Sequence, residues 1–200
     1  MRRAKALLFC LCLLPLVRMV WRVLQGVEVN PIEFITHSTG TWALVGLMLT
    51  LSITPLRRLS GWNKLLQFRR MLGLYAFFYA CLHFITYVWL DQFFDWRHIL
   101  HDIAQRPFIL FGFSAFLCLL PLAITSNDAM VRRLKRRWRQ LHQLVYPIAI
   151  LGVVHYWWLV KKDISQPLIY AGILAVLLGI RLVWRWAPRI MSMPRKISEP

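Results

Sequence analysis

The sequence predicts an all-α membrane protein that folds as a single six-transmembrane helix bundle. Apolar residues make up 58% of the 200 positions, and the mean hydropathy of +0.53 is typical of an integral membrane protein. Six segments approach the roughly 20 apolar residues that a helix needs to cross a bilayer. The charged residues are clustered between these segments. One transmembrane domain therefore accounts for residues 1–200.

The six expected spans are bounded by polar or basic links. They cover approximately residues 6–24, 40–56, 70–90, 107–125, 141–160 and 168–187. The first span follows the basic start MRRAK, which is also typical of a secretory signal peptide. Arg18 and Arg22 come after its apolar core and no small-x-small cleavage site is present, so we interpret the segment as an uncleaved span.

Basic residues are concentrated in alternate links, which indicates how the bundle is oriented. The second link, the fourth link and the C-terminal tail contain, in this order, Arg57, Arg58, Lys64, Arg69 and Arg70, then Arg132, Arg133, Lys135, Arg136, Arg137 and Arg139, then Arg189, Arg195 and Lys196. The positive-inside rule places such links on the cytoplasmic side. Both termini are therefore predicted to be cytoplasmic.

Composition also argues against several other classes of protein. The net charge of +17 comes from links between apolar spans, so we expect no nucleic-acid partner. The four cysteines lie within apolar runs and lack zinc-type spacing, so neither a disulfide nor a metal site follows from them. The longest link has about 16 residues and no glycine-rich nucleotide motif. We identify no internal repeat.

Two of the six histidines lie deep in apolar runs, His83 in LHFITY and His155 in GVVHYWW. An ionisable side chain is costly in lipid and normally faces the bundle interior. His83 follows Arg70 by 13 positions and His155 follows Leu141 by 14, so a rise of ~1.5 Å per residue places both ~20 Å from the cytoplasmic ends of their spans. Two neutral imidazoles at one depth can bind a haem iron from its two faces. His83 and His155 are therefore the predicted axial ligands.

His142 marks a second level nearer the cytoplasm. It precedes His155 on the same span by a rise of ~19.5 Å, which resembles the separation of two stacked redox sites. The third span has Arg69 and Arg70 at this depth instead of a histidine. Arginine is a poor iron ligand but binds propionate, phosphate or a quinone oxygen well. His142, Arg69 and Arg70 therefore predict a second cofactor site, with His142 either as a further iron ligand or as a binding group of another kind.

The other histidines have weaker cases. His98 and His101 lie in the link before the fourth span, where water reaches them, and His37 is best interpreted as an interfacial polar residue. Three further residues fit a nearby porphyrin but equally fit ordinary helix packing and the aromatic belt: Gly73, Gly152 and Tyr87.

Several segments together resemble the MsrQ (YedZ) family of haem-binding membrane subunits. They are ITPLRR, RRMLGLY, LHFITY, ITSNDAM, RWRQLHQLVYPIAILGVVHY and QPLIYAG. The resemblance covers about residues 35–180, nearly the whole membrane core. More distantly, the chain resembles the ferric reductase-like transmembrane domain, which has histidines on its third and fifth helices.

The resemblance implies a b-type haem protein of the bacterial inner membrane. Such a protein takes electrons from the quinone pool, or from a cytoplasmic flavin reductase, and passes them to MsrP, a periplasmic molybdopterin enzyme that reduces oxidised methionines. Family members are also associated with FMN. By position, the histidines of the family fall on His83, His142 and His155. The arginine pair in the third span departs from the oxidase pattern and leaves a second haem open.

Three functions compete. The favoured one is an electron-transfer subunit, rather than the catalytic subunit, of an oxidoreductase system, in which the protein orients and tunes haem b. A proton-coupled membrane transporter could use the histidines as a relay, although no Asp or Glu lies within a predicted span. A structural membrane anchor would need the histidines only for hydrogen bonds between helices.

Overall fold

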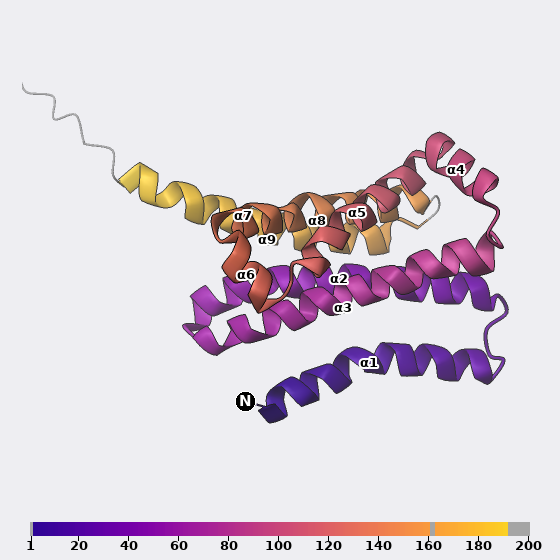
Figure 1. Cartoon of the computed structure of the whole chain (residues 1–200), viewed down its shortest axis with the longest axis horizontal. Coiled ribbons are helices and arrows are strands. Elements are labelled where there is room, and N and C mark those ends of the chain that lie inside the picture. Colours follow the sequence, from indigo (N-terminus) through magenta and orange to yellow (C-terminus); the bar gives the residue numbers. More distant parts are fainter. Residues whose placement is uncertain (1, 161–162, 192–200) are drawn as a thin grey trace, which may run out of the picture.

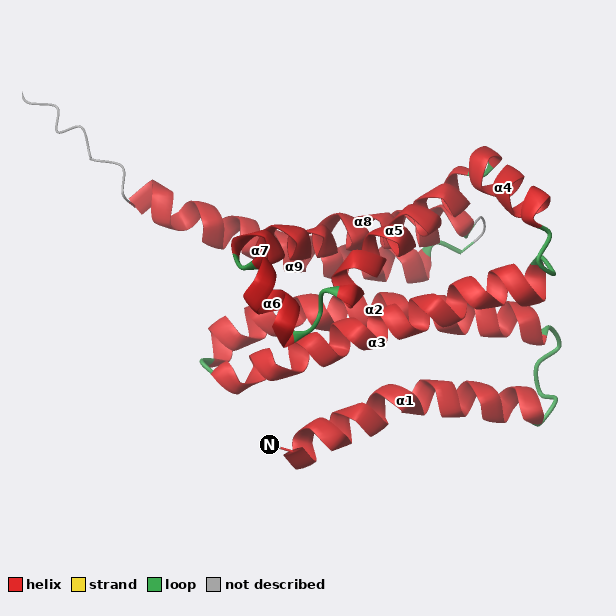
Figure 2. Ribbon diagram, viewed as in Figure 1, coloured by secondary structure: helices red, strands yellow, loops and turns green. Residues whose placement is uncertain are grey.

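The computed structural model describes residues 2–160 and 163–191, and this part of the chain is helical without any strand (Figures 1 and 2). The helices are α1 (Arg2–Leu24), α2 (Pro31–Ser60), η1 (Asn63–Leu65), α3 (Leu66–Ile85), η2 (Thr86–Asp91), α4 (Trp96–Gln105), α5 (Pro107–Ile124), α6 (Asp128–Leu134), α7 (Arg136–Leu141), η3 (His142–Leu144), α8 (Val145–Leu159) and α9 (Ser165–Met191). The predicted all-α membrane class is confirmed.

Five helical segments of the described chain are long and apolar enough to cross a bilayer. They are Arg2–Leu24, Pro31–Ser60, Asn63–Asp91, Pro107–Ile124 and Ser165–Trp186. Each coincides with one of the six expected spans. The remaining expected span, 141–160, falls on η3 and the 15-residue α8, which follow α7 without a break. Helical structure is thus continuous there, while the count of six spans stays a prediction. Four basic residues of the predicted charge pattern lie outside the described residues: Lys161, Lys162, Arg195 and Lys196.

The long helices form two packed layers, with α2 and α3 in one layer and α5, α8 and α9 in the other (Figure 1). The core lies between them and includes Leu51, Ala76 and Ile148, which are at most 1% exposed. Small residues allow α2 and α3 to approach closely, since a Cβ placed on Gly46 would lie 2.9 Å from that of Ala76. This close pair forms one wall of the site described below.

Helix α1 lies along the outside of the α2–α3 pair (Figure 1) and contributes little to the core. Two hydroxyl groups of α3 fasten it. The Tyr75 hydroxyl donates to the carbonyl of Phe9 at 3.1 Å, and the Tyr79 hydroxyl donates to that of Cys12 at 2.7 Å. Most of its apolar side chains are exposed, as expected of a helix that faces lipid.

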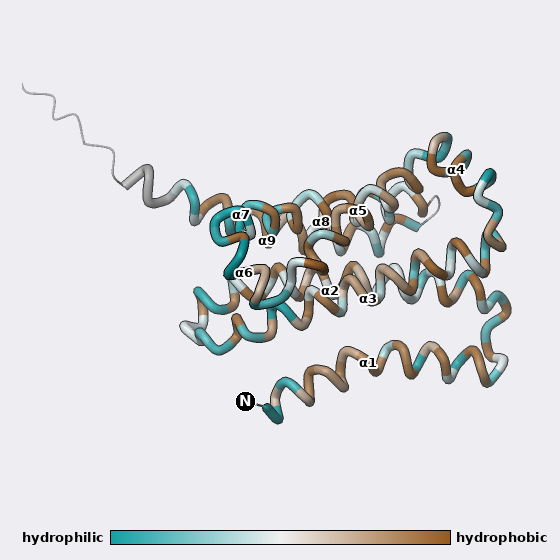
Figure 3. Tube along the Cα trace, viewed as in Figure 1, coloured by the Kyte–Doolittle hydropathy of each residue, from teal (hydrophilic) through white to brown (hydrophobic). Residues whose placement is uncertain are grey.

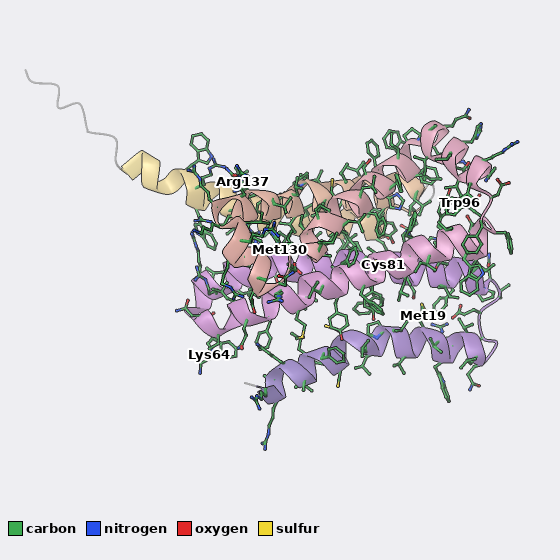
Figure 4. The ribbon with its side chains drawn as sticks, viewed as in Figure 1. Met19, Lys64, Cys81, Trp96, Met130 and Arg137 are labelled. Carbon is green, nitrogen blue, oxygen red and sulfur yellow. The ribbon has the colours of Figure 1, made fainter. Side chains whose placement is uncertain are left out.

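Polar residues gather at the two ends of the bundle (Figure 3). Lys64 and Arg137 lie at the end formed by α6 and α7, whereas Trp96 lies at the opposite end with α4 (Figure 4). We call these the α6/α7 end and the α4 end. The basic segment SNDAMVRRLKRRWRQ is divided into α6 and α7 at Lys135, whose φ is +47°.

Candidate functional site

His83 on α3 and His155 on α8 meet between the two layers of the bundle. Their ring centroids are 6.1 Å apart, and the ring planes are inclined by 76°. Both rings line a cavity of about 360 Å³ that lies mainly between α2, α3, α5 and α8. The common depth expected from the spacing of the sequence therefore brings the two imidazoles together.

A main-chain carbonyl fixes the tautomer of each imidazole. Nδ1 of His83 lies 2.9 Å from the carbonyl oxygen of Thr36, and Nδ1 of His155 lies 2.6 Å from that of Phe108. A carbonyl oxygen can only accept, so both Nδ1 atoms carry the proton and donate it. In neutral imidazoles both Nε2 atoms then keep a lone pair, which is the arrangement found in histidines that bind a metal.

A glycine faces each imidazole from the neighbouring helix. A Cβ placed on Gly40 would lie 3.0 Å from Cε1 of His83, and one on Gly112 would lie 2.8 Å from Nδ1 of His155. Any larger residue would push the ring aside. We did not predict these two glycines from the sequence and named Gly73 and Gly152 instead, of which only Gly152 lines this cavity.

The two halves of the site repeat each other, although we identified no internal repeat in the sequence. Each histidine follows its carbonyl partner by 47 positions. Gly40 precedes His83 by 43 positions, and Gly112 precedes His155 by the same number. The helix pair α2–α3 thus presents one imidazole, and the pair α5–α8 presents the other in the same way. These matched spacings were the signal in the sequence that would have identified both glycines.

The geometry fits a metal ion held between the two rings. A transition metal binds an imidazole nitrogen at about 2 Å, which sets two opposing ring centres about 6 Å apart. The described residues contain no group of three or more His, Cys, Asp or Glu side chains that could hold a bare ion. A metal between these two imidazoles would therefore need further ligands from a bound molecule. Apolar side chains suited to the faces of a macrocycle line the cavity, including the stacked pair Phe84 and Phe116, 4.7 Å apart.

The second predicted level is also a cavity, of about 320 Å³, near the α6/α7 end. Arg69, Arg70 and His142 line it together, as their positions in the sequence indicated. The ring of His142 stacks on that of Trp138 with the centroids 3.9 Å apart, and Nε2 of His142 is buried without a hydrogen-bond partner. Nη1 of Arg70 pairs with Asp128 at 2.8 Å. His142 therefore offers a free ring nitrogen, while one arginine is already engaged.

The two cavities are adjacent. Leu47 of α2 and Leu119 of α5 line both of them, and the second leucine follows the first by the same 72 positions that separate His83 from His155. A thin apolar wall therefore separates the cavities, so one cofactor in each would lie within short reach of the other.

Asp102 and Arg106 form a charged cluster near the α4 end of the first cavity. They belong to the same link as His98 and His101, yet the Asp102 side chain is only 3% exposed and its Oδ1 lies 3.2 Å from Nε of Arg106. Arg106 and Tyr87 line the cavity. His98, in contrast, is half exposed, in agreement with the expectation of access to water.

The fold and the paired imidazoles define a helical membrane protein of the ferric reductase-like class. In agreement, the family model described as "Ferric reductase like transmembrane component" matches residues 39–153. No solved structure gives a significant match.

Three relatives share the name "Protein-methionine-sulfoxide reductase heme-binding subunit MsrQ". The one from Herminiimonas arsenicoxydans is 55% identical over 92% of this chain and 87% of its own length. The relative from Xanthomonas euvesicatoria pv. vesicatoria (strain 85-10) is 48% identical over 98% of this chain and 93% of its own length. The relative from Xanthomonas campestris pv. campestris (strain 8004) is 53% identical over 86% of this chain and 78% of its own length. The chain therefore belongs to the MsrQ family, which confirms the resemblance drawn from its motifs.

Proposed function

We propose that this chain is a membrane b-type cytochrome subunit whose haem iron is bound axially by His83 and His155. One observation carries the proposal: the ring centroids of the two imidazoles are 6.1 Å apart, a separation that suits a shared metal, and each Nδ1 proton is held by a carbonyl. The names of the MsrQ relatives, which describe haem-binding subunits of a methionine sulfoxide reductase, support it independently.

Haem bound at this site would supply one-electron redox chemistry through its iron. The residues around it have distinct tasks. The carbonyls of Thr36 and Phe108 orient the imidazoles and make them more basic ligands. Gly40 and Gly112 leave room for the rings. The apolar cavity walls exclude water, which keeps the local dielectric low and affects the reduction potential.

The cavity near the α6/α7 end is the proposed site at which electrons enter. Its guanidinium groups and the free Nε2 of His142 are suited to a quinone oxygen or to the phosphate of FMN. The donor is the quinone pool or a cytoplasmic flavin reductase. His142 as ligand of a second haem is the remaining alternative for this level.

The proposed direction of transfer is toward the α4 end and a periplasmic molybdopterin methionine sulfoxide reductase, MsrP. Lys64 and Arg137, one from each basic link, lie at the α6/α7 end (Figure 4), and the positive-inside rule supports a cytoplasmic position for this end. The protein then lies in the bacterial inner membrane with both termini cytoplasmic. MsrP would perform the repair reaction, and this subunit would deliver its electrons.

The experiment that tests the proposal is a dithionite-reduced minus air-oxidised spectrum of the purified protein, combined with a pyridine haemochrome assay. We expect the sharp bands of a six-coordinate b-type haem, and the haem content per chain decides between one site and two. A colourless protein, after expression with ample haem, would contradict the proposal and favour a proton transporter or a structural anchor.

A further inference from the structure

The cavity between His83 and His155 is polar at one end only. Its central walls are apolar, whereas Tyr87, Asp91, Arg106 and His37 line it on the α4 side of the imidazoles. Tyr87 follows His83 by one helical turn, and Arg106 immediately precedes α5. The cavity is thus amphipathic along its length, with its donor groups gathered at the α4 end.

Arg106 is held in place at this end of the cavity. Its Nε pairs with Oδ1 of Asp102, which lies one turn earlier and is almost fully buried. Using Nε for this contact leaves the two Nη groups of the guanidinium available for another partner. Among the described residues that line the cavity, Arg106 is also the one Lys or Arg side chain.

The Tyr87 hydroxyl is the second available group. Its oxygen is enclosed and makes no well-formed hydrogen bond, although it lies beside the carboxylate of Asp102, whose Oδ2 also has no partner. An enclosed hydroxyl without a partner is costly, because it has lost its hydration without compensation. Tyr87 lies on η2, a π-helical turn that interrupts the regular helix directly after α3, and such turns are frequent at functional sites.

We propose that Arg106 and Tyr87 form a carboxylate-binding subsite that receives a propionate of the haem. This inference rests on the proposed function, since it concerns the same cofactor. A fixed guanidinium and a phenolic hydroxyl are both donors, and a carboxylate accepts from both. The apolar part of the macrocycle then lies between the imidazoles, and its carboxylate edge faces the α4 end. Two negative side chains lie nearby: Asp91 is exposed and therefore screened by water, and the buried Asp102 is already paired with Arg106.

Haem with free propionates and its dimethyl ester, in which both carboxylates are blocked, distinguish this subsite from a general effect on the cavity. The apoprotein is reconstituted with each compound, and the affinity is measured from the absorbance of the bis-imidazole form. For the wild-type protein we expect the ester to bind about tenfold to hundredfold more weakly, the factor that corresponds to one charge-assisted hydrogen bond.

The variants Arg106→Gln and Tyr87→Phe, each measured with both compounds, complete a thermodynamic cycle. Each should weaken the binding of free haem, yet each should bind the ester no more weakly than the wild-type protein does. Arg106→Gln should also lower the midpoint potential, because a cation near the iron favours the reduced form. Arg97→Gln is the matched control, since Arg97 is exposed on α4 and does not line the cavity.

The outcomes separate the two levels of the proposal. If the fold-loss of affinity caused by the substitution and that caused by the ester multiply, the two act independently. That result would overturn the subsite but not the proposal that His83 and His155 are the axial ligands. A wild-type protein that gives no bis-imidazole spectrum with either compound would overturn the proposed function itself. If Arg106→Gln does not fold, Tyr87→Phe decides alone, since it removes a single hydroxyl and keeps the ring.

Discussion

The guanidinium of Arg181 donates to the main-chain carbonyl of Leu51, which belongs to another helix and lies 130 positions earlier. Pro55 has no N–H, so it leaves this carbonyl of α2 without its usual helical donor. Nη1 of Arg181 donates to Leu177 at 2.9 Å, and the guanidinium lies over the ring of Tyr146. A charged residue within a span thus satisfies the group that a proline exposes.

Replacement of Arg181 by methionine should destabilise the bundle. The side chain keeps most of its apolar contacts, but the Leu51 carbonyl is left buried without a donor, which costs about 1–3 kcal/mol. Thermal unfolding of the purified protein in detergent measures the loss. Arg185→Met is the control, because Arg185 is exposed on the same helix. Equal stability of the two variants would show that the Arg181 contact contributes nothing.

Replacement of either proposed axial histidine by alanine should remove most of the haem. Each change deletes one ligand and leaves an open coordination position, so we expect His83→Ala and His155→Ala to lose the six-coordinate spectrum. Haemochrome content per chain is the measurement. His98→Ala is the matched control, since His98 is half exposed at the α4 end. Full haem with an unchanged spectrum in either variant would disprove the pairing.

His142→Ala should separate the two levels of the bundle. Because His142 lines the second cavity and not the first, we expect the haem between His83 and His155 to remain. Reduction by a soluble quinol should become slower, since the free Nε2 at the proposed entry site is lost. Stopped-flow absorbance records this rate. Complete loss of haem would show instead that His142 is itself an essential ligand.

The glycines facing the imidazoles give a test that leaves every polar group in place. Gly40→Ala and Gly112→Ala add only a methyl group, but it would lie within about 3 Å of a histidine ring. Forcing a packed ring aside costs about 1–3 kcal/mol, so haem affinity should fall by roughly tenfold or more.

Gly172→Ala on α9 is the matched control, because nothing lies within 4 Å of its added methyl group. This change should leave haem affinity unaltered and should stabilise the helix slightly, since alanine has the higher helix propensity. If Gly40→Ala and Gly112→Ala bind haem as this control does, the imidazoles have more freedom than the structure indicates.

Periodicity and depth were sufficient to predict the main features of the site. The apolar runs predicted the five long apolar helices that the structure shows, and counting residues along the runs placed His83 and His155 at one level, as observed. The same counting brought His142 to the level of Arg69 and Arg70. These inferences succeed because the rise of a helix is nearly constant.

Contacts that depend on side-chain direction could not be predicted in this way. Which glycine faces which ring depends on the rotation of two helices about their axes, so Gly40 and Gly112 were missed. Water access was expected for the histidines of the polar link before the fourth span, but the burial of Asp102 on α4 in this link was not predicted. The division between α6 and α7 occurs at Lys135, which has a positive φ. Lysine is not a residue type from which a positive φ is expected.

The repeated arrangement of α2–α3 and α5–α8 also affects how the protein is assembled. Each of these two helix pairs supplies one imidazole together with the carbonyl and the glycine that position it. A partly synthesised chain that ends before α8 therefore lacks one side of the site, even when the pair α2–α3 has folded. A haem bound between His83 and His155, as proposed, would join two halves of the bundle that are synthesised at different times.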